Sequence, residues 1–155
     1  MATPRFHLVL VEPEIAPNTG NAGRLALAVG ARLHLVHPLG FRTDEKAVRR
    51  AGLDYWKHVD KVEHASWDAF REWAGDRRIL VFSSHASQPF TRCEFRPDDA
   101  LVFGRESVGL PESIRAAYPA YAIPMAGPTR SLNLSNALAV VAYAALQRLE
   151  PALFS

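Results

Sequence analysis

"FHLVLVEPEIAPNTGNAGRLALAVGARLHLVH", residues 6–37, carries a clear secondary-structure pattern. It begins and ends with short β-branched or apolar runs, FHLVLV and RLHLVH, which are typical of strands. Between these runs the pattern predicts a helix from about Asn18 to Gly30. A strand, a helix and a second strand in this order indicate neighbouring parallel strands that are covered by a helix.

The same alternation continues through the rest of the chain. Further strand-like runs are RILVFSS, ALVFG and AYAIPM. Helices are predicted from Thr43 to about Gly52, from Ser66 onward, after Pro111, and over an apolar run that ends near Leu149. With 155 residues the chain can bury one core, so we expect a single domain over residues 1–155. The pattern predicts an α/β fold with a mostly parallel sheet and helices on both of its faces.

Composition excludes several kinds of protein. Cys93 is the only cysteine, so an intrachain disulfide and a cysteine-based metal cluster are both excluded. The formal charge of +2 and the pI near 8.9 permit a nucleic acid partner without requiring one. The amino terminus MATPRFHLVLVEPE is too short and too soon acidic for a signal peptide, so we expect a cytoplasmic protein. The histidines are dispersed, and structural roles are expected for His34 and His37 at a strand end.

A second stretch, "RSLNLSNALAVVAYAAL" at residues 130–146, raises the question of quaternary structure. Its residues 137–146 would be apolar around a whole helix, whereas a helix on one sheet needs only an apolar stripe. The run is too short for a membrane span, which takes about 20 apolar residues. Complete burial within the monomer is one explanation. We favour the other, a homodimer interface, because a sheet of about five strands rarely encloses a helix on all sides.

Three loops follow predicted strands at the edge where open α/β sheets bind ligands. The first loop, Glu12 to Arg24, lacks the G-x-G pair of a dinucleotide fingerprint; taken alone, Asn18 is explained as a helix cap and Arg24 as an exposed helix cation. The second loop, Phe103 to Pro111, is not a P-loop, and its glycines either admit a ligand or only make the turn. The third loop, Ile123 to Ala137, has more polar residues than one helix cap requires, which suggests a site. Those residues are Arg130, Ser131, Asn133, Ser135 and Asn136.

The motifs in these loops resemble those of a known family. NTGNAGR, LVFGRESVGLP and IPMAGPTRSLNLSNALAVVAYAAL are similar to the three ordered motifs of the SPOUT superfamily of knotted RNA methyltransferases, in the branch that methylates ribose 2′-hydroxyls. VEPEIAPNTGN, LGFRTDEKAVRRAGLDYW and RSLNLSNA are most similar to its minimal subgroup, the tRNA (cytidine/uridine 2′-O)-methyltransferases that act at the wobble position. The resemblance covers nearly the whole chain.

The resemblance implies a fold, a cofactor and a partner. It implies a deep trefoil knot near the carboxyl terminus, a feature that composition and periodicity do not predict. There the second loop, the third loop and the last helix would form a pocket for S-adenosylmethionine, without a metal. It also implies tRNA as substrate and a homodimer paired through the first and last helices, so that each site uses residues of both subunits.

The resemblance also assigns roles to single residues. Arg24 matches the arginine that activates the ribose hydroxyl. The residues matched to cofactor-binding positions are Phe82, Gly104, Ile123, Ser131 and Leu132. The polar residues matched to positions around the reacting atoms are Asn18, Glu106, Ser131 and Asn133. The chain departs from the family pattern at Arg105, at Val108, and at Gly23, where a larger apolar residue is usual.

The chemistry of such a transfer agrees with these residue types. A sulfonium is already an activated methyl donor, so the enzyme needs to align the nucleophile and stabilise its developing negative charge. Because an arginine side chain stays protonated in proteins, Arg24 is a poor general base. We expect it to stabilise the ribose alkoxide by a charge-assisted hydrogen bond, while a neighbouring group, a phosphate or water accepts the proton.

Residues 46–61, KAVRRAGLDYWKHVDK, mix cations with aromatic residues and leave two explanations open. The cations Lys46, Arg49, Arg50, Lys57 and Lys61 lie around Tyr55 and Trp56. They suit phosphate contacts and base stacking, but a solvated helix face with two core aromatics explains them equally well. The alternative functions are 2′-O-methylation of another RNA such as rRNA and a non-enzymatic RNA-binding domain. A nicotinamide-dependent oxidoreductase is disfavoured by the missing G-x-G-x-x-G.

Overall fold

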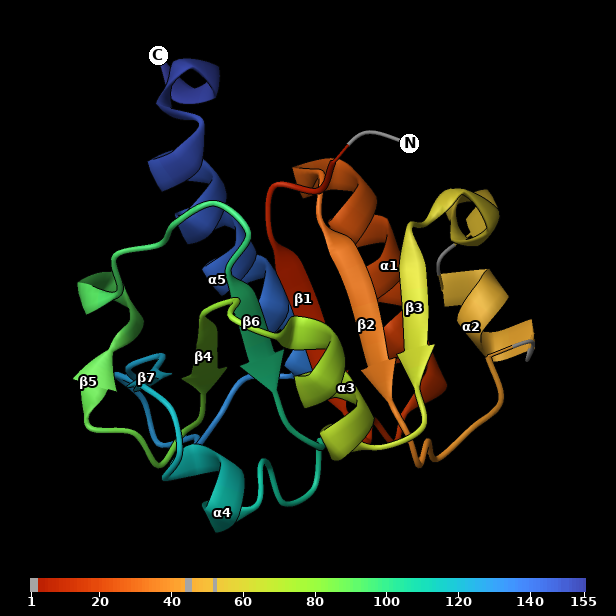
Figure 1. Ribbon diagram of the computed structural model, residues 1–155, viewed down its shortest axis with the longest axis horizontal. Coiled ribbons are helices and arrows are strands. Elements are labelled where there is room, and N and C mark those ends of the chain that lie inside the picture. Colours follow the sequence, from red (N-terminus) through yellow and green to blue (C-terminus); the bar gives the residue numbers. More distant parts are fainter. Residues whose placement is uncertain (1–2, 44–45, 52) are drawn as a thin grey trace.

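A parallel sheet with helices on both faces forms the framework of the protein (Figure 1). The computed structural model describes residues 3–43, 46–51 and 53–155, and the side chains at positions 47, 49, 51, 53 and 54 lie outside the described part. Within it, seven strands pair in the order β3-β2-β1-β6-β4-β7-β5, and all neighbours are parallel. The strands are β1 (His7–Val11), β2 (Arg32–Val36), β3 (Lys61–His64), β4 (Ile79–Phe82), β5 (Gln88–Pro89), β6 (Ala100–Phe103) and β7 (Ala120–Ala122).

The helices cover both faces of this sheet. The α-helices are α1 (Ala16–Val29), α2 (Lys46–Ala51), α3 (Trp67–Ala74), α4 (Glu112–Arg115) and α5 (Leu134–Leu149). The 3-10 helices are η1 (Leu53–His58), η2 (Phe90–Arg92) and η3 (Pro151–Phe154). In Figure 1, α3 lies in front of the sheet and α1 and α5 lie behind it. The α/β class and the helices on both faces are therefore confirmed.

Most of the expected elements are present, and two strands were not anticipated. The five predicted strands and the helices after Ser66 and Pro111 all form. The helix α1 begins at Ala16, so Asn18 lies in its first turn, and the explanation of Asn18 as a helix cap is wrong. The unanticipated strands are β3, whose sequence KVEH has no apolar run, and β5, which has two residues. Of the helix expected from Thr43 to Gly52, Gly52 lies outside the described residues.

The alternation of side chains along the strands produces two separate cores. Leu8, Leu10, Leu33 and Leu35 pack with residues of α1 and α5 on one face. Val9, Val11, Val36 and Val81 point to the other face and pack with Phe70 and Ala74 of α3. Both faces of the central strands are buried, which explains why these strands are continuous apolar runs.

The ends of the helices follow local capping rules. Ser66 caps α3 by accepting a hydrogen bond from the Ala69 amide at 3.1 Å. The helix α1 ends at Val29 and is capped by Gly30, whose φ of 71° is the left-handed conformation that glycine adopts without strain. At the carboxyl end of α5, Pro151 begins the short helix η3.

The helix α5 is not enclosed within the monomer. Its buried residues include Leu138, Val141 and Leu146, which face the sheet core. On the opposite side, Val140 is 37% exposed and Tyr143 is 44% exposed. The explanation that this apolar helix is fully packed inside one chain is therefore wrong.

Three buried histidines lie in line across β1, β2 and β3 on the α3 side of the sheet. His7 Nδ1 lies 2.9 Å from His34 Nε2, and His34 Nδ1 lies 2.9 Å from His64 Nε2. At the end of the line, His7 Nε2 lies 2.7 Å from Asp98 Oδ1. Burial lowers the pKa values of His7 and His64, and lowers the pKa of His34 to about 2. The structural role expected for His34 is thus confirmed.

Candidate functional site

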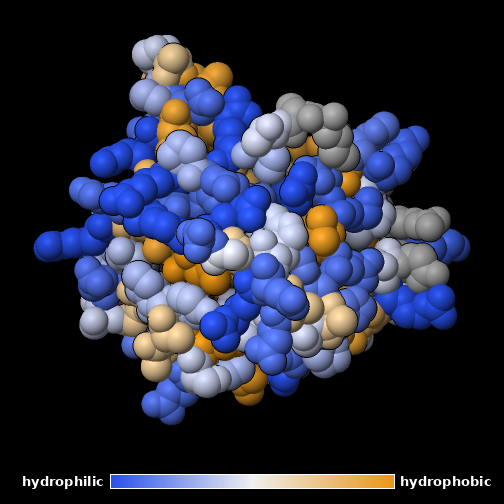
Figure 2. All heavy atoms as spheres, viewed as in Figure 1, coloured by the Kyte–Doolittle hydropathy of each residue, from blue (hydrophilic) through white to orange (hydrophobic). Residues whose placement is uncertain are grey.

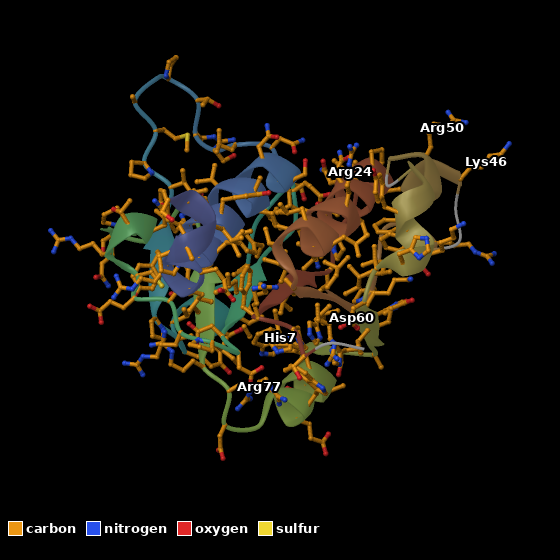
Figure 3. The ribbon with its side chains drawn as sticks, turned by 90° about the horizontal axis from the view of Figure 1, so that it is seen from above. His7, Arg24, Lys46, Arg50, Asp60 and Arg77 are labelled. Atoms are coloured by element: carbon orange, nitrogen blue, oxygen red, sulfur yellow. The ribbon has the colours of Figure 1, made fainter. Side chains whose placement is uncertain are left out.

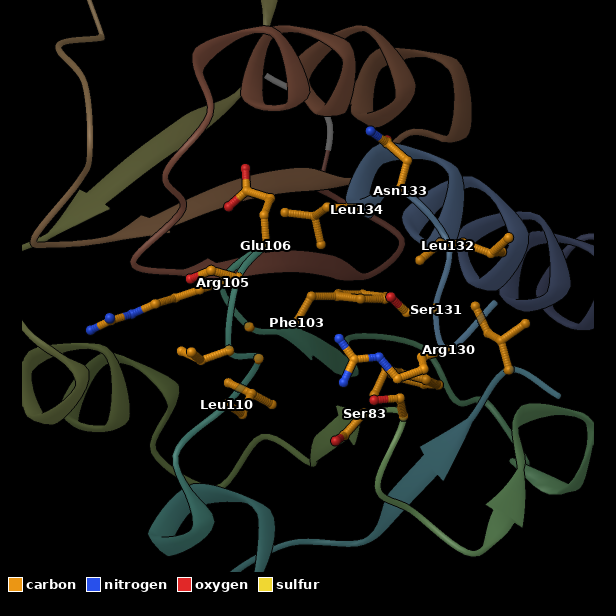
Figure 4. A pocket seen from close by; sticks show the side chains of 18 of the residues that line it. Ser83, Phe103, Arg105, Glu106, Leu110, Arg130, Ser131, Leu132, Asn133 and Leu134 are labelled. Atoms are coloured by element: carbon orange, nitrogen blue, oxygen red, sulfur yellow. The ribbon is translucent and has the colours of Figure 1, made fainter. Parts of the chain in front are cut away.

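A pocket of about 660 Å³ lies where β4, β6 and β7 end, in the size range of small-molecule sites. Its walls come from the segment after β4, from the second and third loops, and from the start of α1 (Figure 4). The predicted site residues that line it are Asn18, Phe82, Gly104, Glu106, Ile123, Ser131, Leu132 and Asn133. Three loops that are far apart in sequence therefore meet in one cavity.

Aromatic rings form an apolar wall of this pocket. Phe82, the last residue of β4, stacks on Phe103, the last residue of β6, with ring centroids 5.2 Å apart and an interplanar angle of 15°. On the other side of β4, Tyr121 of β7 also stacks on Phe82, with ring centroids 6.0 Å apart. Phe82 and Phe103 both line the pocket, and their stacked rings make this wall apolar.

Gly104 is required by the turn of the second loop itself. A Cβ atom at this position would lie 2.3 Å from the backbone carbon of Gly109 and 2.3 Å from the Leu110 nitrogen. Gly109 has a φ of 69°, and its amide donates to the Arg105 carbonyl at 3.0 Å. Of the two explanations for the glycines, this geometry favours the turn, and the turn exposes the loop backbone to the pocket.

Glu106 joins the second loop to the entry of α1. Its Oε1 atom accepts a hydrogen bond from the Glu14 amide at 2.8 Å. Its Oε2 atom accepts bonds from the Ile15 amide at 2.9 Å and from Asn18 Nδ2 at 3.2 Å. Three donors therefore hold this carboxylate, which places it as a clamp between the two loops.

Two further pairs of side chains reinforce the same junction. Glu14 Oε1 accepts hydrogen bonds from the Ser107 amide at 2.9 Å and the Ser107 hydroxyl at 2.7 Å, and these bonds lower the pKa of Glu14. Arg105 forms an ion pair of 2.6 Å with Glu12, a residue whose φ of 52° is unusual outside glycine. The sequence analysis did not single out Glu12, Glu14 or Ser107. The only signal for their pairing was the opposite charge of the glutamates in EPE (residues 12–14) and of the arginine in RES (residues 105–107).

The third loop presents polar groups from its end and from the cap of α5. Asn133 Oδ1 accepts hydrogen bonds from the Ser135 amide at 2.9 Å and the Ser135 hydroxyl at 2.6 Å, which caps α5. Arg130 and Ser131 are exposed and line the pocket (Figure 4). This loop therefore combines helix capping with a cation and a hydroxyl at the cavity.

Arg24 does not line the pocket of its own chain. It is exposed on α1, which starts beside the pocket at Ile15 and Asn18 and leads away from it. Figure 3 places Arg24 on the side of the molecule where Lys46 and Arg50 of α2 lie. Within one chain, the structure separates Arg24 from the other predicted site residues.

The two aromatic residues of η1 have different surroundings. Trp56 is 8% exposed and packs on Gly23, where a Cβ atom would lie 2.8 Å from the indole Cζ3 atom. Lys61 covers the indole, with Nζ 5.1 Å from the ring centroid. Tyr55 is 43% exposed. The core explanation therefore holds for Trp56, and its packing explains why Gly23 replaces a larger residue.

The cations of residues 46–61 are only partly described. Lys46, Arg50 and Lys57 are exposed, whereas the side chain of Arg49 lies outside the described residues.

The described residues contain no group of three or more His, Cys, Asp or Glu side chains placed to hold a metal ion. None of the described helices combines the length and the apolar character that a bilayer span requires.

The chain and its fold match those of a methylase family. A model of the SpoU rRNA Methylase family matches residues 5–143. The chain therefore belongs to the SpoU methylase family.

Individual relatives agree with this assignment. The tRNA (cytidine(34)-2′-O)-methyltransferase of Polaromonas sp. strain JS666 is 47% identical over 147 residues, which span 90% of this chain and 88% of that protein. A solved structure that concerns 2-OH methylation of C/U34 on tRNA has a TM-score of 0.92 and 47% identity, covering 94% of this chain and 97% of its own. The SpoU methyltransferase AviRb from Streptomyces viridochromogenes, in complex with AdoMet, shares the fold with a TM-score of 0.85. AviRb is 23% identical, and the match covers 97% of this chain and 60% of AviRb.

Proposed function

We propose that the protein transfers the methyl group of S-adenosylmethionine to the ribose 2′-hydroxyl of the wobble nucleotide of tRNA, a cytidine or a modified uridine. The observation that carries the proposal is the meeting of the three family loops in one pocket. The Polaromonas relative is named for this reaction on cytidine, and it is similar to this chain over nearly its full length.

The pocket fits S-adenosylmethionine by size and by chemistry. Phe82 and Phe103 give it an apolar wall for an adenine, and the exposed cation of Arg130 suits a carboxylate. The residues assigned to hold the cofactor are Phe82, Gly104, Ile123, Ser131 and Leu132. When bound, S-adenosylmethionine supplies a methyl group that a sulfonium has already activated. The protein must then exclude water and hold the ribose hydroxyl in line.

A homodimer explains the exposed faces of α1 and α5. These helices pack side by side on one face of the sheet. The outer face of α5 carries Asn136, Val140, Tyr143 and Gln147, and that of α1 carries Pro17, Asn21, Arg24 and Ala28. Arg24 is the single charged residue among these eight, as expected for a surface that is buried in an assembly. The face covered by α3 is mainly hydrophilic, with apolar side chains in small separate groups (Figure 2).

In this dimer Arg24 of one subunit serves the pocket of the other. This arrangement accounts for its position outside the pocket of its own chain. Its guanidinium donates a charge-assisted hydrogen bond to the oxygen that becomes nucleophilic, which lowers the cost of forming the alkoxide. Asn18, Glu106, Ser131 and Asn133 surround the reacting atoms, and the three hydrogen bonds of Glu106 favour a positioning role for it.

The path of the chain supports the proposed trefoil knot near the carboxyl terminus. After β6 the chain passes to β7 on the far side of β4, and α5 then returns to pack against α1. AviRb, which is a SpoU methyltransferase, has the same fold. We place the enzyme in the cytoplasm, where a tRNA substrate is available.

The test is a map of 2′-O-methylation in tRNA and rRNA from cells with and without this protein. We expect loss of the methyl group at the wobble position of a small set of tRNAs and its return with the purified protein and S-adenosylmethionine. If 2′-O-methyl groups were lost only from rRNA, the substrate would instead be rRNA, which the family's description names. A purified protein that binds RNA but not S-adenosylmethionine in calorimetry would be a non-enzymatic RNA-binding domain.

A further inference from the structure

Arg24 lies over the ring of Tyr55, a contact that the proposed reaction does not yet explain. The central carbon of the guanidinium lies 5.0 Å from the ring centroid, within the range of a cation–π interaction. Among the described residues, this ring is the only partner that the structure gives the Arg24 side chain. An exposed arginine without such a partner would sample many rotamers.

The Tyr55 ring is fixed to α1 through its neighbour Trp56. The indole of Trp56 packs on Gly23, directly before Arg24, and leaves no room there for a Cβ atom. Lys61 lies over the same indole and donates a hydrogen bond to the Trp56 carbonyl at 3.0 Å. The turn that carries Tyr55 is thus anchored one residue away from Arg24. Gly23 and Trp56 together set the distance between the phenol ring and the guanidinium.

A ring is a suitable partner for a catalytic guanidinium. A carboxylate would occupy the N–H donors of Arg24 and offset its charge. The face of a phenol ring attracts the cation while the N–H donors in the guanidinium plane stay available. The arrangement therefore restricts the direction of Arg24 without using the groups that the ribose oxygen needs.

We infer that Tyr55 is a positioning residue for methyl transfer, which holds the Arg24 guanidinium in the orientation that enters the partner's pocket. The inference rests on the proposed function, because it takes Arg24 as the group that stabilises the alkoxide. Tyr55 acts through Arg24 and does not touch the reacting atoms. Its ring matters and its hydroxyl does not.

The experiment compares Tyr55→Leu with Tyr55→Phe in single-turnover methyl transfer, with S-adenosylmethionine and tRNA saturating. Tyr55→Leu should lower the rate roughly twofold to fivefold, the scale of an exposed cation–π contact, whereas Tyr55→Phe should keep it near wild type. Calorimetric affinity for S-adenosylmethionine should be unchanged in both. His58→Leu is the matched control, because His58 is exposed in the same turn, and its rate should equal that of wild type. If Tyr55→Leu does not fold, Tyr55→Met takes its place.

A double-mutant cycle separates positioning from direct contact with RNA. In an Arg24→Ala background, Tyr55→Leu should cause no further loss of rate, because the group it positions is gone. An equal loss in both backgrounds, with a weaker affinity for tRNA, would mean that Tyr55 stacks on the RNA and would overturn the inference. Wild-type rates for Tyr55→Leu would also overturn it. If Arg24→Ala itself kept the wild-type rate, the proposed role of Arg24 would fail instead.

Discussion

Replacing Glu106 by Gln changes one oxygen of the clamp between the first and second loops. The best placement of the amide oxygen is that of Oε2, where it keeps the bonds from the Ile15 amide and Asn18. The new NH2 group then faces the Glu14 amide, which loses its acceptor at 2.8 Å. Loss of one hydrogen bond to a charged acceptor costs about 1.5–3 kcal/mol, and since this bond is only partly buried we expect about 2 kcal/mol.

The assay is urea and thermal unfolding at one fixed protein concentration, because the stability of a dimer depends on concentration. For a chain of this size, about 2 kcal/mol corresponds to a fall in Tm of roughly 4–8 °C. The affinity for S-adenosylmethionine should also weaken in calorimetry, because the clamp holds the loop that lines the pocket. Glu112→Gln, the same chemical change at an exposed position, is the control and should leave Tm unchanged. If Glu106→Gln kept the wild-type Tm but lost methyl transfer, the clamp explanation would be wrong.

Variants of Arg24, a variant of Tyr143 and the pH dependence of stability test the remaining assignments. Arg24→Ala should leave binding of S-adenosylmethionine intact but lower the rate of single-turnover methyl transfer at least about a hundredfold. Arg24→Lys should recover little of that rate, because the planar guanidinium fork is lost. A near-normal rate in Arg24→Ala would make Arg24 a structural residue. Tyr143→Asp should shift the sedimentation of the protein from dimer to monomer, and a wild-type monomer at micromolar concentration would contradict the interface. The pKa values of His7, His34 and His64 are lowered by burial, so the folded state binds fewer protons than the unfolded state below about pH 6.5. The free energy of unfolding should therefore fall as the pH is lowered from 7 to 5, by up to about 1.4 kcal/mol per pH unit for each histidine. Urea titrations at several pH values measure this, and a free energy that does not change with pH would show that the line of histidines is not held neutral.

Local sequence determined most of the elements and the edge of the sheet where the pocket forms. The strands of the two cores are predictable because both faces are buried, which demands the apolar runs that mark them. Ser66 and Pro111 marked helix starts through chemistry that acts within one turn. Because parallel strands end at the same edge, the loops after β1, β6 and β7 had to meet there. The short strands β3 and β5 were not predictable, since pairing with a neighbour, not their own composition, makes them strands.

Tertiary structure alone decided which polar groups pair across the loops and which aromatic residue is buried. The sequence around Glu106 does not show whether this residue is a clamp or a catalytic carboxylate. The three groups that donate hydrogen bonds to it lie about 90 residues away in the chain. Trp56 and Tyr55 are neighbours in the chain, yet packing against Gly23 buries Trp56, whereas the exposed ring of Tyr55 contacts the guanidinium of Arg24. The resemblance assigned Arg24 to the site, but only the direction of α1 shows that it lies outside its own pocket. Such pairings depend on how distant segments approach in space, and the pattern of any one segment does not contain that distance.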